Sequence, residues 1–190
     1  MLILDDDLDV SINYQYKKIR NTGGEQDIFE CFVRTHILNT STEPLTEKEE
    51  YVIELINTYP ENIFNNTISI LTDLGRFKII MRRALKYFGN DGNYNWLDVS
   101  SCTSFMGLFS SPEFSEFNGD ITKWDTRSVQ NMLKMFQGCK QFNRDITGWN
   151  VSNVKFVNKD TYLNASSELK DMFQKMKAEK KFKNYPMVKL

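Results

Sequence analysis

The chain has 190 residues, which is room for one domain or for one domain with a small second one. A composition of 41% hydrophobic and 26% charged residues, with a mean hydropathy of −0.47, excludes a disordered chain, and no apolar run is long enough to span a membrane. A net charge of −1 excludes a strong overall attraction to nucleic acid, and three cysteines are too few and too scattered for a disulfide framework or a zinc site, so we expect reduced thiols.

The charge is unevenly distributed along the chain. Residues 1–70 carry 13 acidic and 5 basic side chains, whereas residues 161–190 carry 3 and 7. We therefore divide the chain into an N-terminal hairpin-plus-helix segment (1–70), a capping helix with repeats (71–160), and a C-terminal capping helix with a basic tail (161–190). The acidic head and the basic tail either attract each other within one molecule, or mediate head-to-tail association or contact with an acidic partner surface.

The first segment alternates like a β-strand. Apolar and aromatic residues recur at every second position from Leu8 to Tyr16, and residues 21–24 (Asn-Thr-Gly-Gly) are typical of a turn. The stretch from Ile28 to Leu38 is rich in β-branched and aromatic residues, which predicts the return strand of a hairpin. A helix over residues 27–37 is the alternative.

Helices are predicted next. Thr46 and Glu49 form a capping box, since each side chain can bond to an orphan backbone N–H group at the start of a helix. A weaker helix is predicted from Ile63 to Leu71. Asp73 then caps a further helix that Gly89 ends, because glycine tolerates the left-handed conformation there.

A repeated pattern lies between residues 97 and 157. The segment Phe117–Trp124 returns 25 positions later as Phe142–Trp149, and an earlier copy begins at Leu97, 27 positions before Trp124. The two extra residues fall in the Ser110–Glu116 stretch, which contains a proline and is typical of a loop.

Each copy predicts one short helix and one short strand. Ser101, Ser128 and Asn153 occupy one register position and are good helix N-caps, and apolar residues follow each of them at helical spacing. An Asp-Ile-Thr trio comes next and is too short for anything but a strand. Such a unit cannot bury its apolar face alone, so the copies are expected to stack into a solenoid.

The recurrence also assigns roles to single side chains. The recurring apolar positions are expected to stack in the core: Ile121, Ile146, Trp124 and Trp149. Asp120 and Asp145 recur with the repeat, which favours a structural role in turns over a catalytic pair of carboxylates. Asn118 and Asn143 suit a ladder of bonds from side chain to backbone, and Cys102 aligns with valines of the later copies, as a core residue does.

The repeats resemble the BspA-like bacterial repeat family, a relative of the leucine-rich repeats. That family repeats an F-N-x-D-I-S-x-W-D-V-S-N-V pattern at a period of about 25 residues, and the copies at 117–136 and 142–154 match it closely. The resemblance implies a protein-interaction scaffold and supplies no catalytic residue. Short, leaderless forms also resemble proteins carried by bacteriophages, which implies a phage setting for this chain.

The C-terminal segment predicts a closing helix. Ser166 or Ser167 caps it, and Leu169, Phe173 and Met176 line one face. Because a terminal repeat must hide its apolar edge, we expect this helix to cover the open end of the array. The alternatives are a helix that docks into a partner, or a lysine-rich face that touches nucleic acid or anionic lipid.

No pattern indicates an active site. His36 is the only histidine and has no nucleophile pattern nearby. The aspartates between positions 5 and 9 lack the glycine and glutamate of a calcium loop. Residues 168–170 (Glu-Leu-Lys) resemble a nuclease motif, but they open a helix where that motif needs a strand. We therefore predict no enzyme, no cofactor and no metal site, with a small metal-dependent nuclease as a remote alternative.

The predicted fold class is α+β: an N-terminal α/β segment followed by a short helix–strand, leucine-rich-repeat-like solenoid with helical caps. The predicted function is a non-enzymatic protein–protein interaction module, as a structural or accessory protein of a bacteriophage. The alternative is an anti-defence protein, a phage-encoded inhibitor that occludes the surface of a host defence protein.

Outward positions that differ between the copies predict where a partner binds. They are Lys123, Arg127 and Lys134. The expected partner is a protein, a second copy of the chain included, rather than a membrane or a nucleic acid. Because the chain starts without the basic region of a secretion signal, the expected location is the bacterial cytoplasm or the virion.

Overall fold

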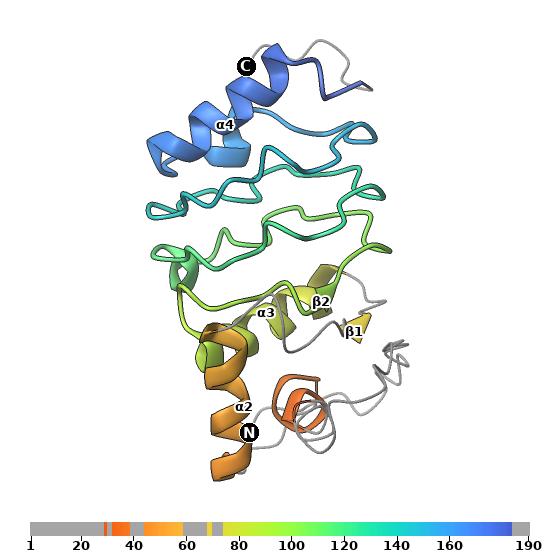
Figure 1. The fold of residues 1–190 in the computed structure, drawn as a ribbon. Helices are drawn as coiled ribbons and strands as arrows, with labels where there is room; N and C mark the ends of the chain where they lie inside the picture. The colour runs from red at the N-terminus through yellow and green to blue at the C-terminus, as the bar shows by residue number, and fades with distance from the viewer. Residues whose placement is uncertain (1–28, 30–31, 39–43, 59–67, 70–73, 184–190) are drawn as a thin grey trace, which may run out of the picture.

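Helices occupy both ends of the structure, and irregular coils lie between them (Figure 1). The structure is a computed structural model that describes residues 29, 32–38, 44–58, 68–69 and 74–183. Its regular elements are, in chain order, the π-helix η1 (Val33–Leu38), α2 (Glu47–Thr58), β1 (Ile68–Ser69), α3 (Leu74–Phe88), β2 (Leu97–Asp98), the 3-10 helices η2 (Pro112–Phe114) and η3 (Lys159–Tyr162), and α4 (Ser167–Ala178). The predicted strand from Leu8 to Tyr16 and the turn at 21–24 lie outside the described residues.

The predicted return strand from Ile28 to Leu38 is wrong, because its described residues are helical. Phe32 stacks on His36 with ring centroids 5.5 Å apart, and both rings meet Tyr87 of α3 edge-on at 5.1 and 5.8 Å. A helix brings residues four apart to one face, where they pack together on α3. Packing on a neighbouring element therefore outweighs the β propensity of this stretch.

The start of α2 carries the predicted capping box. The backbone N–H of Thr46 donates to Glu49 Oε2 at 2.8 Å, and the N–H of Glu49 donates to Thr46 Oγ1 at 3.3 Å. The apolar face that follows is buried at Val52, Ile53 and Ile56. The local capping pattern is therefore confirmed.

The helix α3 ends at the predicted glycine. Gly89 has a φ of +69°, and its N–H donates to the Leu85 carbonyl at 2.9 Å. The buried face of this helix consists of Phe77, Ile80, Met81, Ala84 and Phe88. The helix predicted from Ile63 to Leu71 is wrong at its described positions, since β1 pairs there in parallel with β2 and places Ile68 opposite Leu97.

The predicted fold class is also wrong, because the described residues form no helix–strand units. The described regular structure is mostly helical, and β1 and β2 have two residues each. Between Val99 and Asn158 the structure describes one regular element, the short helix η2. The predicted N-caps Ser101, Ser128 and Asn153 lie in turns that begin no helix.

The chain instead winds through irregular, turn-rich coils that stack between α3 and α4 (Figure 1). We name them coil 1 (residues 90–116), coil 2 (117–141) and coil 3 (142–165). Backbone hydrogen bonds join neighbouring coils: the N–H of Phe105 donates to Asn131 O at 2.8 Å, and the N–H of Phe136 donates to Thr161 O at 2.8 Å. Each coil thus satisfies backbone groups of the coil beside it.

Successive turns account for the spacing of the apolar residues. In coil 2, a backbone N–H donates to the carbonyl three residues earlier, at 3.0–3.1 Å, from Trp124 to Ile121, from Val129 to Thr126 and from Met135 to Met132. Both residues of each pair are buried. A chain of such turns buries every third or fourth side chain, and this is the spacing that the sequence shares with a helix.

The aspartates have the predicted structural role in turns. Asp120 Oδ1 accepts the backbone N–H and the hydroxyl of Thr122 at 3.0 and 2.7 Å, and Asp145 accepts the same two groups of its threonine at 2.9 and 2.7 Å. The predicted asparagine ladder is present as well, since Asn118 Oδ1 accepts the N–H of Asn143 at 3.0 Å. Side chains at repeated positions therefore hold the corners of the coils.

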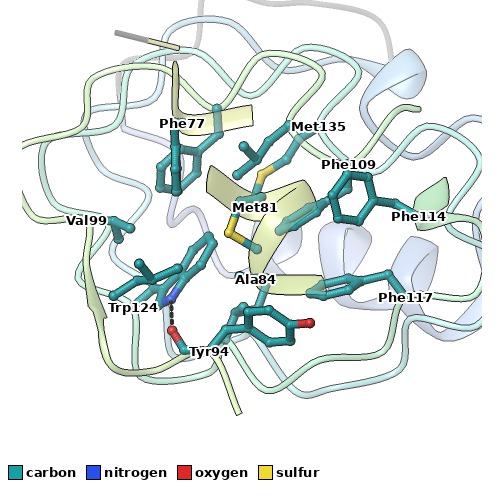
Figure 2. Close-up of a cluster of buried hydrophobic side chains, with 14 of the residues drawn as sticks. Phe77, Met81, Ala84, Tyr94, Val99, Phe109, Phe114, Phe117, Trp124 and Met135 are labelled. Atoms are coloured by element: carbon teal, nitrogen blue, oxygen red, sulfur yellow. Dashed lines mark hydrogen bonds between the residues drawn. The ribbon is translucent and has the colours of Figure 1, made fainter. Parts of the chain in front are cut away.

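Aromatic rings align through the stack. Phe117 and Phe142 lie 6.1 Å apart at an interplanar angle of 12°, and Trp124 and Trp149 lie 6.4 Å apart at 7°. The two tryptophans are 4% and 3% exposed, which confirms that they are core residues. Trp124 Nε1 donates to the Tyr94 carbonyl of coil 1 at 3.0 Å, the bond drawn in Figure 2.

The helix α3 covers the first coil. Phe77 lies 6.0 Å from Phe105 and 5.8 Å from Trp124 between ring centroids. Figure 2 shows Phe77 and Met81 of α3 gathered with the rings of the coils around one buried cluster. The apolar edge of coil 1 is thereby removed from water.

The helix α4 covers the third coil at the opposite end (Figure 1). Ser166 is its N-cap, with a side chain that accepts the N–H of Leu169 at 3.2 Å and donates to the Phe142 carbonyl. Phe173 meets Phe136 at 6.4 Å and Tyr162 at 5.2 Å between ring centroids. The predicted closing helix therefore forms with its apolar face against the coils.

Candidate interaction surface

One side of the coils forms a ladder in which buried and outward residues alternate. Ser104 bridges to Asn131, and Asn131 bridges to Phe156, both in parallel. The next residue of each coil is buried: Phe105, Met132 and Val157. Because successive residues of an extended stretch point to opposite sides, Ser104, Asn131 and Phe156 point away from the core.

Apolar side chains gather on this outward face. Phe156 is 55% exposed, Met106 is 43% exposed, and Leu133 is half-buried. The register places Leu133 beside Met106 and diagonal to Phe156. Asn131 Nδ2 lies 3.8 Å from Met106 Sδ, so side chains of coils 1 and 2 touch on this face. We name Met106, Leu133 and Phe156 the apolar stripe.

Lysines of coils 2 and 3 flank the apolar stripe. Lys134 directly follows Leu133, and Lys155 directly precedes Phe156; both are exposed, as is Lys159. Lys155 Nζ donates to Gln130 Oε1 at 3.1 Å, which holds it across coils 2 and 3. The stripe is therefore bordered by positive charge.

A further lysine approaches from α3. Lys78 Nζ lies close to Gly107, the residue after Met106: any side chain at position 107 would begin 3.3 Å from this ammonium group. Burial lowers the pKa of Lys78, and the charge of Arg82 adds to the effect. The coil stretches that form this face, residues 103–107, 130–134 and 155–159, contain no aspartate or glutamate.

Lys134 has an unusual backbone conformation. Its φ is +56°, and Gly107, at the same register position of coil 1, has a φ of +59°. This left-handed region suits glycine and costs other residues about 1–2 kcal/mol. Coil 2 therefore carries a charged side chain where a glycine would fit the backbone with less strain.

The three predicted partner-binding residues are all exposed and lie in successive turns of coil 2. Arg127 pairs with Asp125, at 2.7 Å between Nη2 and Oδ2 and 2.9 Å between Nε and Oδ1. The hydrogen bond from Arg127 holds the pKa of Asp125 below its usual value. The backbone N–H of Lys123 donates to Asn95 Oδ1 of coil 1 at 2.9 Å. Lys134 adjoins the apolar stripe through Leu133.

The histidine and the two described cysteines are buried. His36 is 5% exposed and packs between Phe32 and Tyr87. Burial raises the pKa of Cys102 to about 11, with a contribution from Asp98, and that of Cys139 to about 12. Cys102 is therefore a buried core residue as predicted, while Cys31 lies outside the described residues.

The described part of the chain lacks two further features. It contains no group of three or more His, Cys, Asp or Glu residues that could hold a metal ion. Its helices include none of the length and apolar character needed to cross a membrane.

The sequence interpretation missed Phe156 as an exposed residue, although the repeat register contains the signal. Phe156 aligns with Asn131 and Ser104, so a large apolar residue stands where the other copies have a polar one. Met106 and Leu133 share a second outward position, where both copies are apolar. An apolar residue at an outward register position was the available clue.

A protein-family model matches the chain. The model of a family described as "Mycoplasma protein of unknown function, DUF285" matches residues 79–187, which is more than half of the chain. This family is associated with BspA-like repeat proteins. Neither the curated proteins nor the solved structures gave a match to the chain.

Proposed function

We propose that this chain, which belongs to the DUF285 family, is a non-enzymatic protein–protein interaction module. The family description assigns no function, so the proposal depends on the surface of the coils. The resemblance of the repeats to the BspA-like pattern supports it, because that resemblance implies an interaction scaffold.

The observation that carries the proposal is a contrast between the buried and the exposed positions of the coils. Several buried positions carry the same residue in coils 2 and 3, as at Ile121 and Ile146 or at Trp124 and Trp149. Outside the turn residues that recur, outward positions differ: Lys123 aligns with Gly148, and Arg127 aligns with Ser152. Repeat proteins bind partners in this way: stacking fixes the core, and the outer side chains are left to determine specificity.

The strained backbone at Lys134 supports the same proposal. A lysine is present where glycine would relieve the left-handed conformation, and its side chain is exposed. Such strain at a surface position favours a use for the side chain outside the fold.

The proposal is tested by isolating complexes of the tagged full chain from the cells it comes from. We expect a protein to copurify in stoichiometric amount. Lys123→Glu with Arg127→Glu should slow its association and change its salt dependence, since exposed charges act mainly on encounter. Lys134→Gly should weaken binding while leaving folding unharmed. Lys140→Glu, on an exposed lysine of the same coil, is the matched control.

Two results would contradict the proposal. One is the absence of a stoichiometric protein partner after gentle crosslinking. The other is turnover of a small molecule that a single carboxylate substitution abolishes. The second result would favour the remote enzyme alternative.

The bacteriophage setting stays a prediction. A virion component should copurify with capsid or tail proteins, whereas an anti-defence inhibitor should copurify with a host nuclease or sensor. The cytoplasmic or virion location is part of the same prediction, and the identity of the partner tests both.

A further inference from the structure

We infer that the apolar stripe and its flanking lysines bind a short segment of another protein in which apolar side chains alternate with carboxylates. The inference rests on the proposed function and adds to it a surface and the chemistry of the partner. The surface consists of Met106, Leu133 and Phe156 with Lys134, Lys155 and Lys159.

The exposure of the stripe is the first argument. Phe156 and Met106 are among the few large apolar side chains that the described structure leaves more than two-fifths exposed, and both lie on one ladder face. The register of the ladder places both side chains on the side opposite the buried Phe105, Met132 and Val157. Neither side chain can therefore turn into the core. A cluster of exposed apolar side chains on one face is typical of a binding site.

The size of the stripe determines the kind of partner. Neighbouring coils lie about 5 Å apart along the ladder, so the stripe, which crosses three coils, extends over about 10 Å. A face of this length offers far less area than the roughly 800 Å² that each partner buries in a standard interface between globular proteins. A short extended segment fits such a face, because its own side chains also alternate.

Charge determines the composition of that segment. The flanking lysines are exposed, and the fifteen residues of the three stretches that form this face (103–107, 130–134 and 155–159) include no acidic side chain. The next carboxylate along coil 3, on Asp160, is half-buried and lies 3.4 Å from Asn158 Nδ2. A segment with carboxylates beside its apolar residues would place opposite charges against the lysines and keep basic segments away.

The test selects binders to the full chain from a library of random short peptides. We expect the selected peptides to be rich in aspartate or glutamate and in large aliphatic or aromatic residues. Met106→Ser with Phe156→Ser should weaken the Kd of the best peptide by roughly tenfold or more, because apolar burial is lost. Lys155→Glu with Lys159→Glu should weaken it similarly, and a repeated selection on that variant should yield basic peptides.

Matched controls come from elements distant in the fold. Tyr51→Ser removes an equally exposed apolar side chain from α2. Lys48→Glu with Lys177→Glu makes the same charge change on the exposed faces of α2 and α4. These controls should leave the peptide Kd unchanged, and all variants should melt like the parent, since each changes an exposed side chain.

Three outcomes would overturn the inference. Peptides that bind the stripe variants and the parent equally would place the binding surface elsewhere and leave the proposed function intact. Selection without enrichment of acidic and apolar residues would refute the stated chemistry. A dimer of the chain that Met106→Ser with Phe156→Ser converts to a monomer would show that a second copy occupies the stripe. Failure of the proposed function itself would appear separately, as the absence of a copurifying protein.

Discussion

At the scale of single residues, the tryptophans of the coils combine apolar burial with a directed hydrogen bond. Trp149 stacks on Trp124, and its Nε1 donates to the Ile121 carbonyl of the preceding coil at 3.2 Å. Trp124 makes the same bond to coil 1. Each indole therefore links two coils through both its ring and its N–H group.

Replacing Trp149 with alanine should lower the free energy of unfolding by roughly 3–5 kcal/mol, as other core aromatic truncations do. Urea denaturation monitored by circular dichroism measures this change. Phe156→Ala, at an exposed ring, should change it by only about 0.5 kcal/mol. A Trp149 variant that melts like the parent but loses its partner would instead make this residue a ligand platform.

The turn carboxylate Asp120 gives a prediction about pH. Burial raises the pKa of Asp120, but hydrogen bonds from Thr122 and Asn95 and the charge of Arg144 outweigh burial, so the pKa lies below its usual value. A carboxyl group with a lowered folded pKa stabilises the protein above its unfolded pKa of about 3.9, and this stabilisation is lost as the pH falls through the folded pKa.

Asp120→Asn should therefore be less stable than the parent at pH 7, by an amount that shrinks as the pH falls below about 4. Asparagine can still accept the N–H of Thr122, so the comparison isolates the charge. Parallel urea titrations across this pH range measure the difference. A difference that stays constant with pH would mean that the carboxylate charge contributes nothing.

The sequence predicts roles at the residue scale well where a position recurs. The recurrence of Trp124 as Trp149 and of Asp120 as Asp145 identified core and turn residues correctly. It aligned Phe156 with Asn131 and Ser104, but it did not show that this position faces outward, because the same apolar spacing was interpreted as a helix.

At the scale of elements, two N-caps of different burial should differ in their contribution to stability. Thr46 caps the exposed start of α2, and its replacement by alanine should cost about 1 kcal/mol. Ser166 caps α4 and is buried, and its hydroxyl also bonds to the Phe142 carbonyl. Ser166→Ala should cost roughly 2 kcal/mol or more, because it also leaves a buried carbonyl unpaired.

Thermal and urea melts of both variants test this order of effects. Ser167→Ala is the matched control, since Ser167 is the exposed neighbour of the cap and should change stability by only about 0.5 kcal/mol. Equal losses at Thr46 and Ser166 would show that the bond to coil 3 adds nothing beyond capping.

The helices α2, α3 and α4 were predictable from the sequence, whereas η1 and the coils were not. Capping residues and a terminal glycine act locally, so Thr46, Gly89 and Ser166 marked real helix ends. In the coils, turns closed by bonds between residues three apart imitate the apolar spacing of a helix. The bonds that decide between the two lie between residues about one coil apart, and spacing within one copy cannot show them.

At the scale of the whole molecule, the described N-terminal residues form part of the core. Phe29 meets Trp96 edge-on at 5.6 Å, and Phe32 meets Phe88 at 6.0 Å. The N–H of Asn93 donates to Asn57 Oδ1 of α2 at 2.9 Å. Coil 1 and α3 therefore depend on contacts from earlier in the chain, a region that the family match does not cover.

A chain that begins at Thr72 should accordingly be less stable than the full chain by roughly 5 kcal/mol, because Phe88 and Trp96 lose their cover and burial of each large apolar side chain contributes about 1.5–3 kcal/mol. It should also expose Phe88 and Trp96 and bind a hydrophobic dye. Calorimetry and dye fluorescence measure both effects. A shortened chain that folds and binds the partner like the parent would mean that residues 1–71 serve neither stability nor binding.

The hydrogen bonds between coils have a consequence for how such a molecule can lengthen. Coil 2 donates to and accepts from its neighbours at equivalent positions, so its two sides are complementary to each other. A tandem duplication of residues 117–141 would insert a second copy of coil 2. The side of this copy that resembles the coil 1 contact would pair with the original coil 2, and its other side would pair with coil 3. Gene-level copying could thus extend the molecule and add one more set of outward positions, while the helices at both ends keep the contacts that they already make.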